Sequence, residues 1–137
     1  MLASLIVSAG CAPDTPLGEV EGTVRLDGRP AGQMLVSFLP DPERGTRGPR
    51  SVAATDAQGR YRLRSDDQRD GAAIGWHRVV IEDLAAYATP REERSSRAQA
   101  ITASRIPRLY SGASETPLRF EVKPVSQTID LDLFSRP

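Results

Sequence analysis

The chain has little of the residue types that build covalent frameworks and active sites. Its 137 residues include one cysteine, Cys11, and one histidine, His77. One cysteine excludes an internal disulfide, and a single His with no Cys nearby cannot supply the ligands of a zinc site. No Gly-x-Ser-x-Gly segment is present, so a hydrolase nucleophile elbow is also absent. These shortages predict a non-enzymatic protein without metal or cofactor.

The chain also has no excess of charge of either sign, and it has few aromatic residues. The 18 basic and 18 acidic residues cancel, which gives no reason to expect nucleic acid as a partner. Aromatic residues make up 5%, so the core of this single domain should be mostly aliphatic. Eleven Gly and eleven Pro are spread through the chain, a composition typical of many short strands joined by tight turns.

No apolar run is long enough to span a bilayer, which takes about 20 residues. Residues 1–10 nevertheless carry no charged side chain and end in Ser-Ala-Gly before Cys11. This ending resembles a bacterial lipoprotein signal peptide, although Ser8 stands where Leu is usual and a basic n-region is missing. The resemblance implies a signal segment at residues 1–11, lipidation of Cys11, a tether at 12–17 and a cell-envelope location. The alternative is a free thiol in an N-terminal segment.

Alternation of apolar and polar residues, together with apolar runs of high strand propensity, predicts seven strands. They cover residues 19–26, 33–39, 51–55, 60–64, 75–82, 118–122 and 126–133. The second is apolar on both faces and should be central. Asp27-Gly28 predicts a two-residue hairpin turn after the first strand. The last two strands, each with one apolar face, are predicted to form a hairpin around Lys123-Pro124.

The segment 55–63 combines a turn with the start of a strand. Asp56 and Gly59 suit the first and last positions of a type I turn, and Tyr61 and Leu63 then alternate with arginines.

Residues 41–50 are predicted to be an exposed loop. The acidic segment 65–71 has the wrong spacing for a calcium loop and contains Arg69, so a solvated turn is predicted there.

His77 is predicted to point into the core, because it shares a strand face with Val79 and Ile81. A single His on such a face is more often a packed, hydrogen-bonded side chain than a ligand or a base.

Residues 83–105 interrupt the series of short predicted strands. A connection this long is uncommon in a compact domain and is either functional or disordered. A solvated loop is one reading. The other is a contact surface for an envelope protein or carbohydrate, with Tyr87, Arg91, Arg94 and Arg97 as candidate contact residues.

The order of these motifs resembles the carboxypeptidase regulatory-like domains found in small bacterial lipoproteins. The matching segments are Val20-x-Gly22-Thr23-Val24, Thr55-Asp56-x-x-Gly59-x-Tyr61, Gly75-x-His77-x-Val79-x-Ile81 and Ile106-Pro107-x-x-Tyr110. The resemblance implies an all-β, seven-stranded, Ig-like or prealbumin-like (transthyretin-like) β-sandwich over residues 18–134, with the exposed insertion at 83–105.

That family's module is an accessory beside a catalytic domain, so the resemblance implies a structural or binding role. The alternative is a transthyretin-fold small-molecule hydrolase or transport module. Such enzymes use several His and Arg residues, and the single His argues against this alternative.

Overall fold

The computed structural model describes residues 15–87 and 104–136, and these ranges are almost entirely strands and loops. The strands are β1 (Leu17–Gly18), β2 (Val20–Leu26), β3 (Arg29–Pro30), β4 (Met34–Pro40), β5 (Ser51–Ala54), β6 (Arg60–Arg62), β7 (Arg64–Ser65), β8 (Ala72–Ala73), β9 (Gly75–Asp83), β10 (Arg119–Val122), β11 (Gln127–Thr128) and β12 (Leu131–Leu133). Three short 3₁₀ helices, η1 (Pro42–Arg44), η2 (Leu84–Tyr87) and η3 (Arg108–Ser111), join them. The predicted all-β class is confirmed.

Twelve strands stand where seven were predicted. Two of the predicted strands are each split in two, and the two-residue strands β1, β3 and β8 are additional. Within the described ranges, no helix combines the length and the apolar character needed to cross a bilayer.

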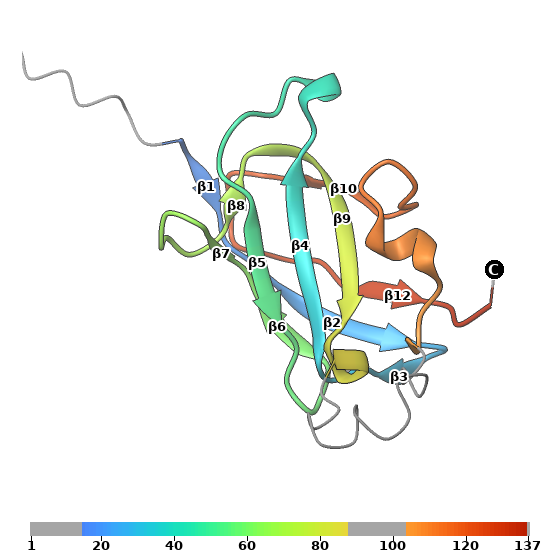
Figure 1. Ribbon diagram of the computed structural model, residues 1–137. Helices are drawn as coiled ribbons and strands as arrows, with labels where there is room; N and C mark the ends of the chain where they lie inside the picture. Colours follow the sequence, from blue (N-terminus) through green and yellow to red (C-terminus); the bar gives the residue numbers. More distant parts are fainter. Residues whose placement is uncertain (1–14, 88–103, 137) are drawn as a thin grey trace, which may run out of the picture.

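One five-stranded sheet, the β4 sheet, has the antiparallel order β10-β9-β4-β5-β7 (Figure 1). Its centre is β4, which pairs Val36 with Ile81 of β9 on one side and with Ala53 of β5 on the other. The prediction of a central second strand is therefore confirmed. Its even-numbered residues Met34, Val36 and Phe38 are fully buried.

The second five-stranded sheet, the β2 sheet, is built around β2, and a third sheet consists only of the antiparallel pair β1 and β8. On one edge β2 pairs antiparallel with β6 and with β3, and the β2–β3 turn is the predicted Asp27-Gly28 hairpin. Both turn residues have positive φ, 50° and 81°, as a type I′ turn requires. On its other edge β2 pairs in parallel with β11 and β12.

The predicted strand 60–64 crosses from one sheet to the other. Its first part, β6, belongs to the β2 sheet, and its second part, β7, belongs to the β4 sheet. Leu63 lies at the crossing, where its N–H donates to the Val20 carbonyl and its own carbonyl accepts from Gly71 N–H. Because the Leu63 side chain is fully buried, the crossing is fixed to the core.

The apolar core is one cluster to which both five-stranded sheets contribute. The β4 sheet contributes Val36, Phe38 and Ile81, and the β2 sheet contributes Val24 and Leu131 among others. Tyr110 of η3 and Ile106, which precedes η3, also belong to this cluster. The aliphatic core expected from the composition is confirmed.

The predicted hairpin between the last two strands is wrong. β10 pairs with β9 in the β4 sheet, whereas β11 and β12 pair with β2 in the other sheet. The Gln127 side chain holds the crossing: its Oε1 accepts from Lys123 N–H at 3.0 Å, and its Nε2 donates to the carbonyls of Lys123 and Val125 at 2.9 Å. Both predicted strands direct their apolar side chains into the same core. The alternation therefore predicted the buried faces correctly, but the predicted strand pairing was wrong.

The turn 55–59 has the predicted geometry. Gly59 N–H donates to the Asp56 carbonyl at 2.9 Å, and the Asp56 carboxylate accepts from the N–H groups of Gln58 and Arg60. Tyr61 then crosses beneath Gly22 of β2 and donates its hydroxyl to the Ile129 carbonyl. A Cβ added at Gly22 would lie 1.9 Å from that carbonyl oxygen, so the tyrosine bridge and the glycine depend on each other.

Candidate functional site

The insertion predicted as a contact surface begins where β9 ends. Asp83 is the last residue of β9, η2 follows it directly, and the chain is described again from Ser104. Tyr87 closes η2, while Arg91, Arg94 and Arg97 lie outside the described residues. The structure therefore describes the two ends of the insertion, at Asp83 to Tyr87 and at Ser104 and Arg105, which are here called its base.

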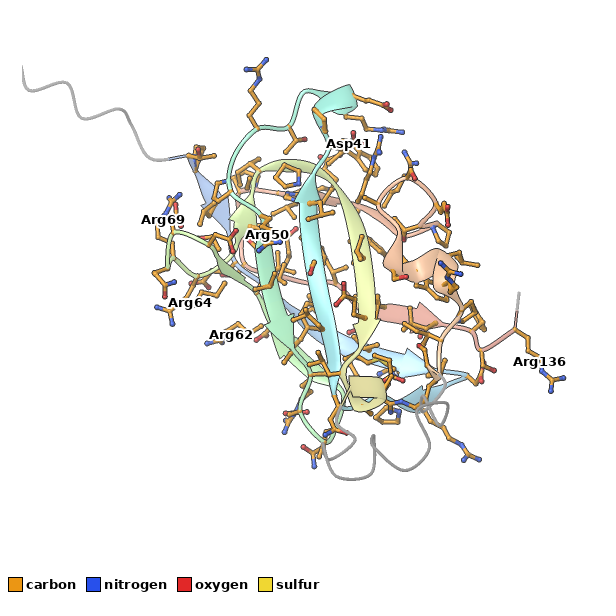
Figure 2. All side chains as sticks on the ribbon, viewed as in Figure 1. Asp41, Arg50, Arg62, Arg64, Arg69 and Arg136 are labelled. Carbon is orange, nitrogen blue, oxygen red and sulfur yellow. The ribbon has the colours of Figure 1, made fainter. Side chains whose placement is uncertain are left out.

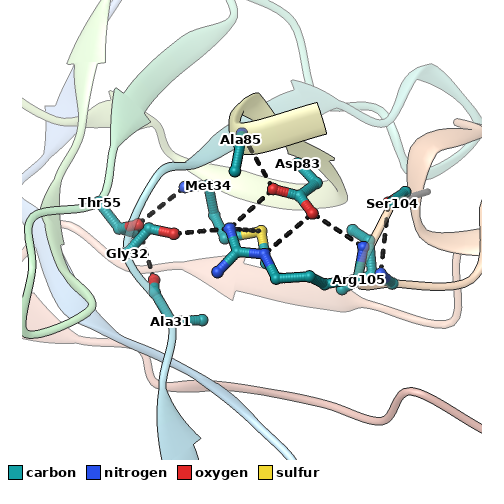
Figure 3. A network of polar contacts seen from close by, with 9 residues as sticks. Ala31, Gly32, Met34, Thr55, Asp83, Ala85, Ser104 and Arg105 are labelled. Atoms are coloured by element: carbon teal, nitrogen blue, oxygen red, sulfur yellow. Dashed lines mark hydrogen bonds and ion pairs between the residues drawn. The ribbon is translucent and has the colours of Figure 1, made fainter. Parts of the chain in front are cut away.

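That base is closed by an ion pair between Asp83 and Arg105 (Figure 3). The Arg105 guanidinium lies 2.7 Å from Oδ1 through Nη2 and 3.0 Å from Oδ2 through Nε. The carboxylate also accepts from the main-chain N–H of Arg105 at 2.8 Å and from that of Ala85 at 3.1 Å. Two-point contacts of this kind are among the stronger hydrogen bonds in proteins.

The environment keeps this pair charged. Burial acts to raise the pKa of Asp83, which is 4% exposed, but the hydrogen bonds and the charge of Arg105, with the Ala85 N–H, outweigh burial and leave the pKa below its usual value. Hydrogen bonding to Asp83 in turn raises the pKa of Arg105. The base of the insertion is therefore an ion pair throughout the neutral pH range.

Both sides of the insertion are also attached to the loop between β3 and β4. Arg105 Nη2 donates to the Gly32 carbonyl at 2.8 Å, and Leu84 N–H donates to the Gln33 carbonyl at 2.8 Å. Gln33 adopts a positive φ of 56°, which is uncommon for a residue other than glycine. The segment that holds the insertion is thus itself held in a specific backbone conformation.

Thr55 connects this base to the turn 55–59 (Figure 3). Its buried hydroxyl accepts from Met34 N–H at 3.0 Å and donates to the Ala31 carbonyl at 2.8 Å. The segment 55–59 and the base of the insertion are therefore both hydrogen-bonded to residues 31–34. An open hollow of about 420 Å³ adjoins the base and is lined by Leu26, Asp27, Arg29, Pro30, Ala31 and Arg105.

His77 is packed in the core, as predicted. Its side chain is fully buried, its Nε2 lies 2.7 Å from the Ala73 carbonyl, and its ring centroid is 5.7 Å from that of Phe38. Burial lowers the pKa of His77, although hydrogen bonding with the main chain of Ala73 and Phe38 acts in the opposite direction. The imidazole is thus neutral near pH 7 and out of reach of solvent.

The carboxylates of the acidic turn 65–71 are exposed, and two of the three pair with arginines. Asp66 accepts from Arg50 at 2.8 Å, and Asp67 accepts from Arg69 at 2.6 Å. Hydrogen bonds from Arg69 and Ser65 lower the pKa of Asp67 to about 2. These contacts agree with the predicted solvated turn. No cluster of three or more potential metal ligands occurs in residues 15–87 or 104–136.

Asp41 is a buried charged residue that the sequence analysis placed in an exposed loop. It is 2% exposed, caps η1 by accepting from Glu43 N–H at 3.1 Å, and lies 3.5 Å from Arg78 and 4.0 Å from Arg119. The sequence signal was Asp before Pro42, a usual start for a helical turn. Its arginine partners come from β9 and β10, so only the tertiary structure could show them.

Comparison of the chain with protein-family models, with curated proteins and with solved structures finds no match.

Proposed function

We propose that this chain is a lipid-anchored domain of the cell envelope with a non-enzymatic binding role. Its two sheets form a prealbumin-like β-sandwich of the carboxypeptidase regulatory-like kind. Lipidated Cys11 holds the domain at the membrane, and the insertion 83–105 contacts an envelope protein or a carbohydrate.

The observation that carries this proposal is the position of the Asp83–Arg105 base relative to the tether. Asp83 pairs with Met34 at the start of β4. Thr15, the first described residue, lies at the opposite end, against Gly48 in the loop that follows β4 (Figure 1). Seven residues of β4 separate the two ends, roughly 20 Å at the usual rise of a strand. A tether at one end and an insertion held at the other suit a domain that presents a loop away from its anchor.

The described interior offers little to an enzyme hypothesis. The only histidine is enclosed between the sheets, and the buried carboxylates Asp41 and Asp83 are each engaged by arginines. Each of these groups therefore has a structural role in the fold, which supports a binding function over a catalytic one.

Two measurements test the proposal. Intact mass of the membrane-extracted protein should correspond to a chain that begins at Cys11 and carries acyl groups. An unmodified thiol with Met1 retained would contradict the anchor. Crosslinking in the native envelope should yield a discrete adduct that disappears when residues 88–103 are replaced by a short Gly-Ser linker.

The linker variant keeps Asp83 and Arg105, so the base of the insertion stays intact and the fold can be checked by circular dichroism. As a matched control, Arg60→Gln changes an exposed arginine on β6 and should leave the adduct unchanged. An adduct that survives in the linker variant would show that the insertion is not the contact surface.

A further inference from the structure

At the end of the molecule where the tether joins the sheets, the first described residue, Thr15, is four residues from Cys11 in the sequence. Arg69 donates through Nη1 to the Thr15 carbonyl at 2.7 Å, which fixes the first described residue beside β1 (Figure 2). Four peptide units separate Cys11 from Thr15, a reach of at most about 14 Å. If Cys11 is lipidated, as proposed above, this end of the molecule stays close to the head groups.

A second loop that approaches Thr15 at this end comprises residues 42–50, here named the tether-end loop. A Cβ added at Gly48 would lie 2.9 Å from Thr15, so the tether and the loop are in contact. The loop carries Glu43, Arg44, Arg47 and Arg50. It therefore has more positive than negative charge.

The neighbouring arginines of β9 and β10 engage acids of this end, and Glu121 of β10, opposite Trp76, adds one more acid. Arg78 contacts both Glu43, at 2.9 Å, and Asp41, at 3.5 Å, and Arg119 is 4.0 Å from Asp41. Two arginines and two carboxylates thus neutralise one another, with the Asp41 carboxylate buried among them.

Arg50 is neutralised as well, by Asp66 at 2.8 Å. This leaves Arg44 and Arg47. Arg44 lies over the Trp76 ring, 4.5 Å from its centroid, and Arg47 has no ion-pair partner within the described ranges. A cation on an aromatic face keeps its charge and its outward hydrogen-bond donors.

Two turns at the opposite end of the molecule have a balanced charge. The β2–β3 turn carries Asp27 and Arg29, and the turn 55–59 places Asp56 3.4 Å from Arg60. Each turn has one acid and one arginine. Arg44 and Arg47, which no ion pair engages in residues 15–87 and 104–136, lie instead on the loop in contact with Thr15.

We propose that Arg44 and Arg47 contact the phosphate groups of anionic phospholipids in the membrane that holds the anchor. Guanidinium groups bind phosphate oxygens through paired donors. Each arginine close to an anionic surface strengthens binding about fivefold. The contact would hold the sandwich upright, with the insertion pointing away from the bilayer.

The test uses the full chain with Cys11→Ser, so that acylation plays no part. Binding to vesicles of phosphatidylglycerol and phosphatidylcholine is measured by sedimentation and divided by binding to phosphatidylcholine alone, which removes any charge-independent insertion of residues 1–10. We expect Arg44→Gln with Arg47→Gln to lower this ratio about 25-fold. Arg29→Gln with Arg60→Gln makes the same charge change at the opposite end and should leave the ratio unchanged. Equal effects of the two pairs, or no effect of the first, would overturn the proposal.

A second measurement examines orientation and uses the only cysteine and the only tryptophan of the chain. The protein is coupled through Cys11 to a maleimide lipid, and Trp76 fluorescence is quenched by a nitroxide on the head groups. Quenching should be strong in anionic vesicles, weaker in Arg47→Gln, and unchanged in Arg29→Gln. Absence of quenching in the coupled wild-type chain would contradict the orientation. Because the coupling is chemical, this result is independent of whether cells acylate Cys11.

Discussion

Asp83 and Arg105 are 22 positions apart in the sequence, yet their side chains meet at two points, 2.7 Å and 3.0 Å from nitrogen to oxygen. The contact joins the end of β9 to the segment that precedes η3 and so closes the insertion. Since bringing two distant points of a chain together has an entropic cost, the strong contact between Asp83 and Arg105 helps to offset that cost. The stability of the base of the insertion therefore depends in part on this ion pair.

Arg105→Ala should lower the free energy of unfolding by about 2 kcal/mol, because it leaves the buried Asp83 carboxylate without its cation. Arg105→Lys keeps the charge without the two-point geometry and should lose less. Urea unfolding measures both changes. Arg60→Ala, which removes an exposed ion pair with Asp56, should cost no more than about 0.5 kcal/mol. Equal losses in Arg105→Ala and Arg60→Ala would show that the base is not held by this pair.

His77 should make the protein less stable as the pH falls below 6.5. Burial lowers the pKa of folded His77 below the ordinary value of 6.5, so below that pH the unfolded chain takes up a proton that the folded chain does not. The loss continues until the folded imidazole itself is protonated, with a slope of at most about 1.4 kcal/mol per pH unit.

His77→Phe tests this dependence by urea unfolding across the pH range. The variant should fold, since a second ring can pack against Phe38, and should lose the slope just below pH 6.5. The paired carboxylates Asp67 and Asp83 have lowered pKa values, so their contribution is present above pH 3.8 and is lost only at lower pH. An unchanged slope in His77→Phe would assign the effect to other groups. Loss of a measurable activity in the folded variant would instead overturn the non-enzymatic proposal.

Gly59→Ala should be markedly destabilising, by about 2–3 kcal/mol. Gly59 has a φ of 74°, and an added Cβ would lie 2.5 Å from the Val24 carbonyl oxygen. Gly28→Ala is the matched control: its φ is 81°, but nothing lies within 4 Å of an added Cβ. It should cost only the backbone strain, about 1 kcal/mol. Similar thermal stabilities of the two variants would show that the close approach at Gly59 is relieved by movement of β2.

Asp41→Asn should lower the free energy of unfolding by about 2 kcal/mol, because the buried carboxylate faces Arg78 and Arg119. Glu43→Gln removes a carboxylate from the same cluster, but one whose side chain is 77% exposed, so the expected loss is below about 1 kcal/mol. Denaturant unfolding in parallel compares the two. A larger loss in Glu43→Gln would place the stabilising contact at the surface.

Local patterns predicted the elements of this fold. The positions of β2 and β10 followed from alternation, and those of β4, β5 and β9 from apolar runs and strand propensity between turn signals. The turns at Asp27-Gly28 and at residues 55–59 followed from residues that favour those backbone conformations. The core position of His77 followed from strand period alone. Each of these depends on neighbours within a few residues, which a sequence displays directly.

What the sequence by itself determined is therefore the all-β class, the strand positions and which side of each strand faces inward. The tertiary structure alone decided that β10 and the β11–β12 segment belong to different sheets, because one-sided alternation suits either side of a shared core. It also decided that Asp41 is buried and that Asp83 meets Arg105. Those contacts join residues distant in the chain, and their energy depends on burial and on distances that no local pattern encodes.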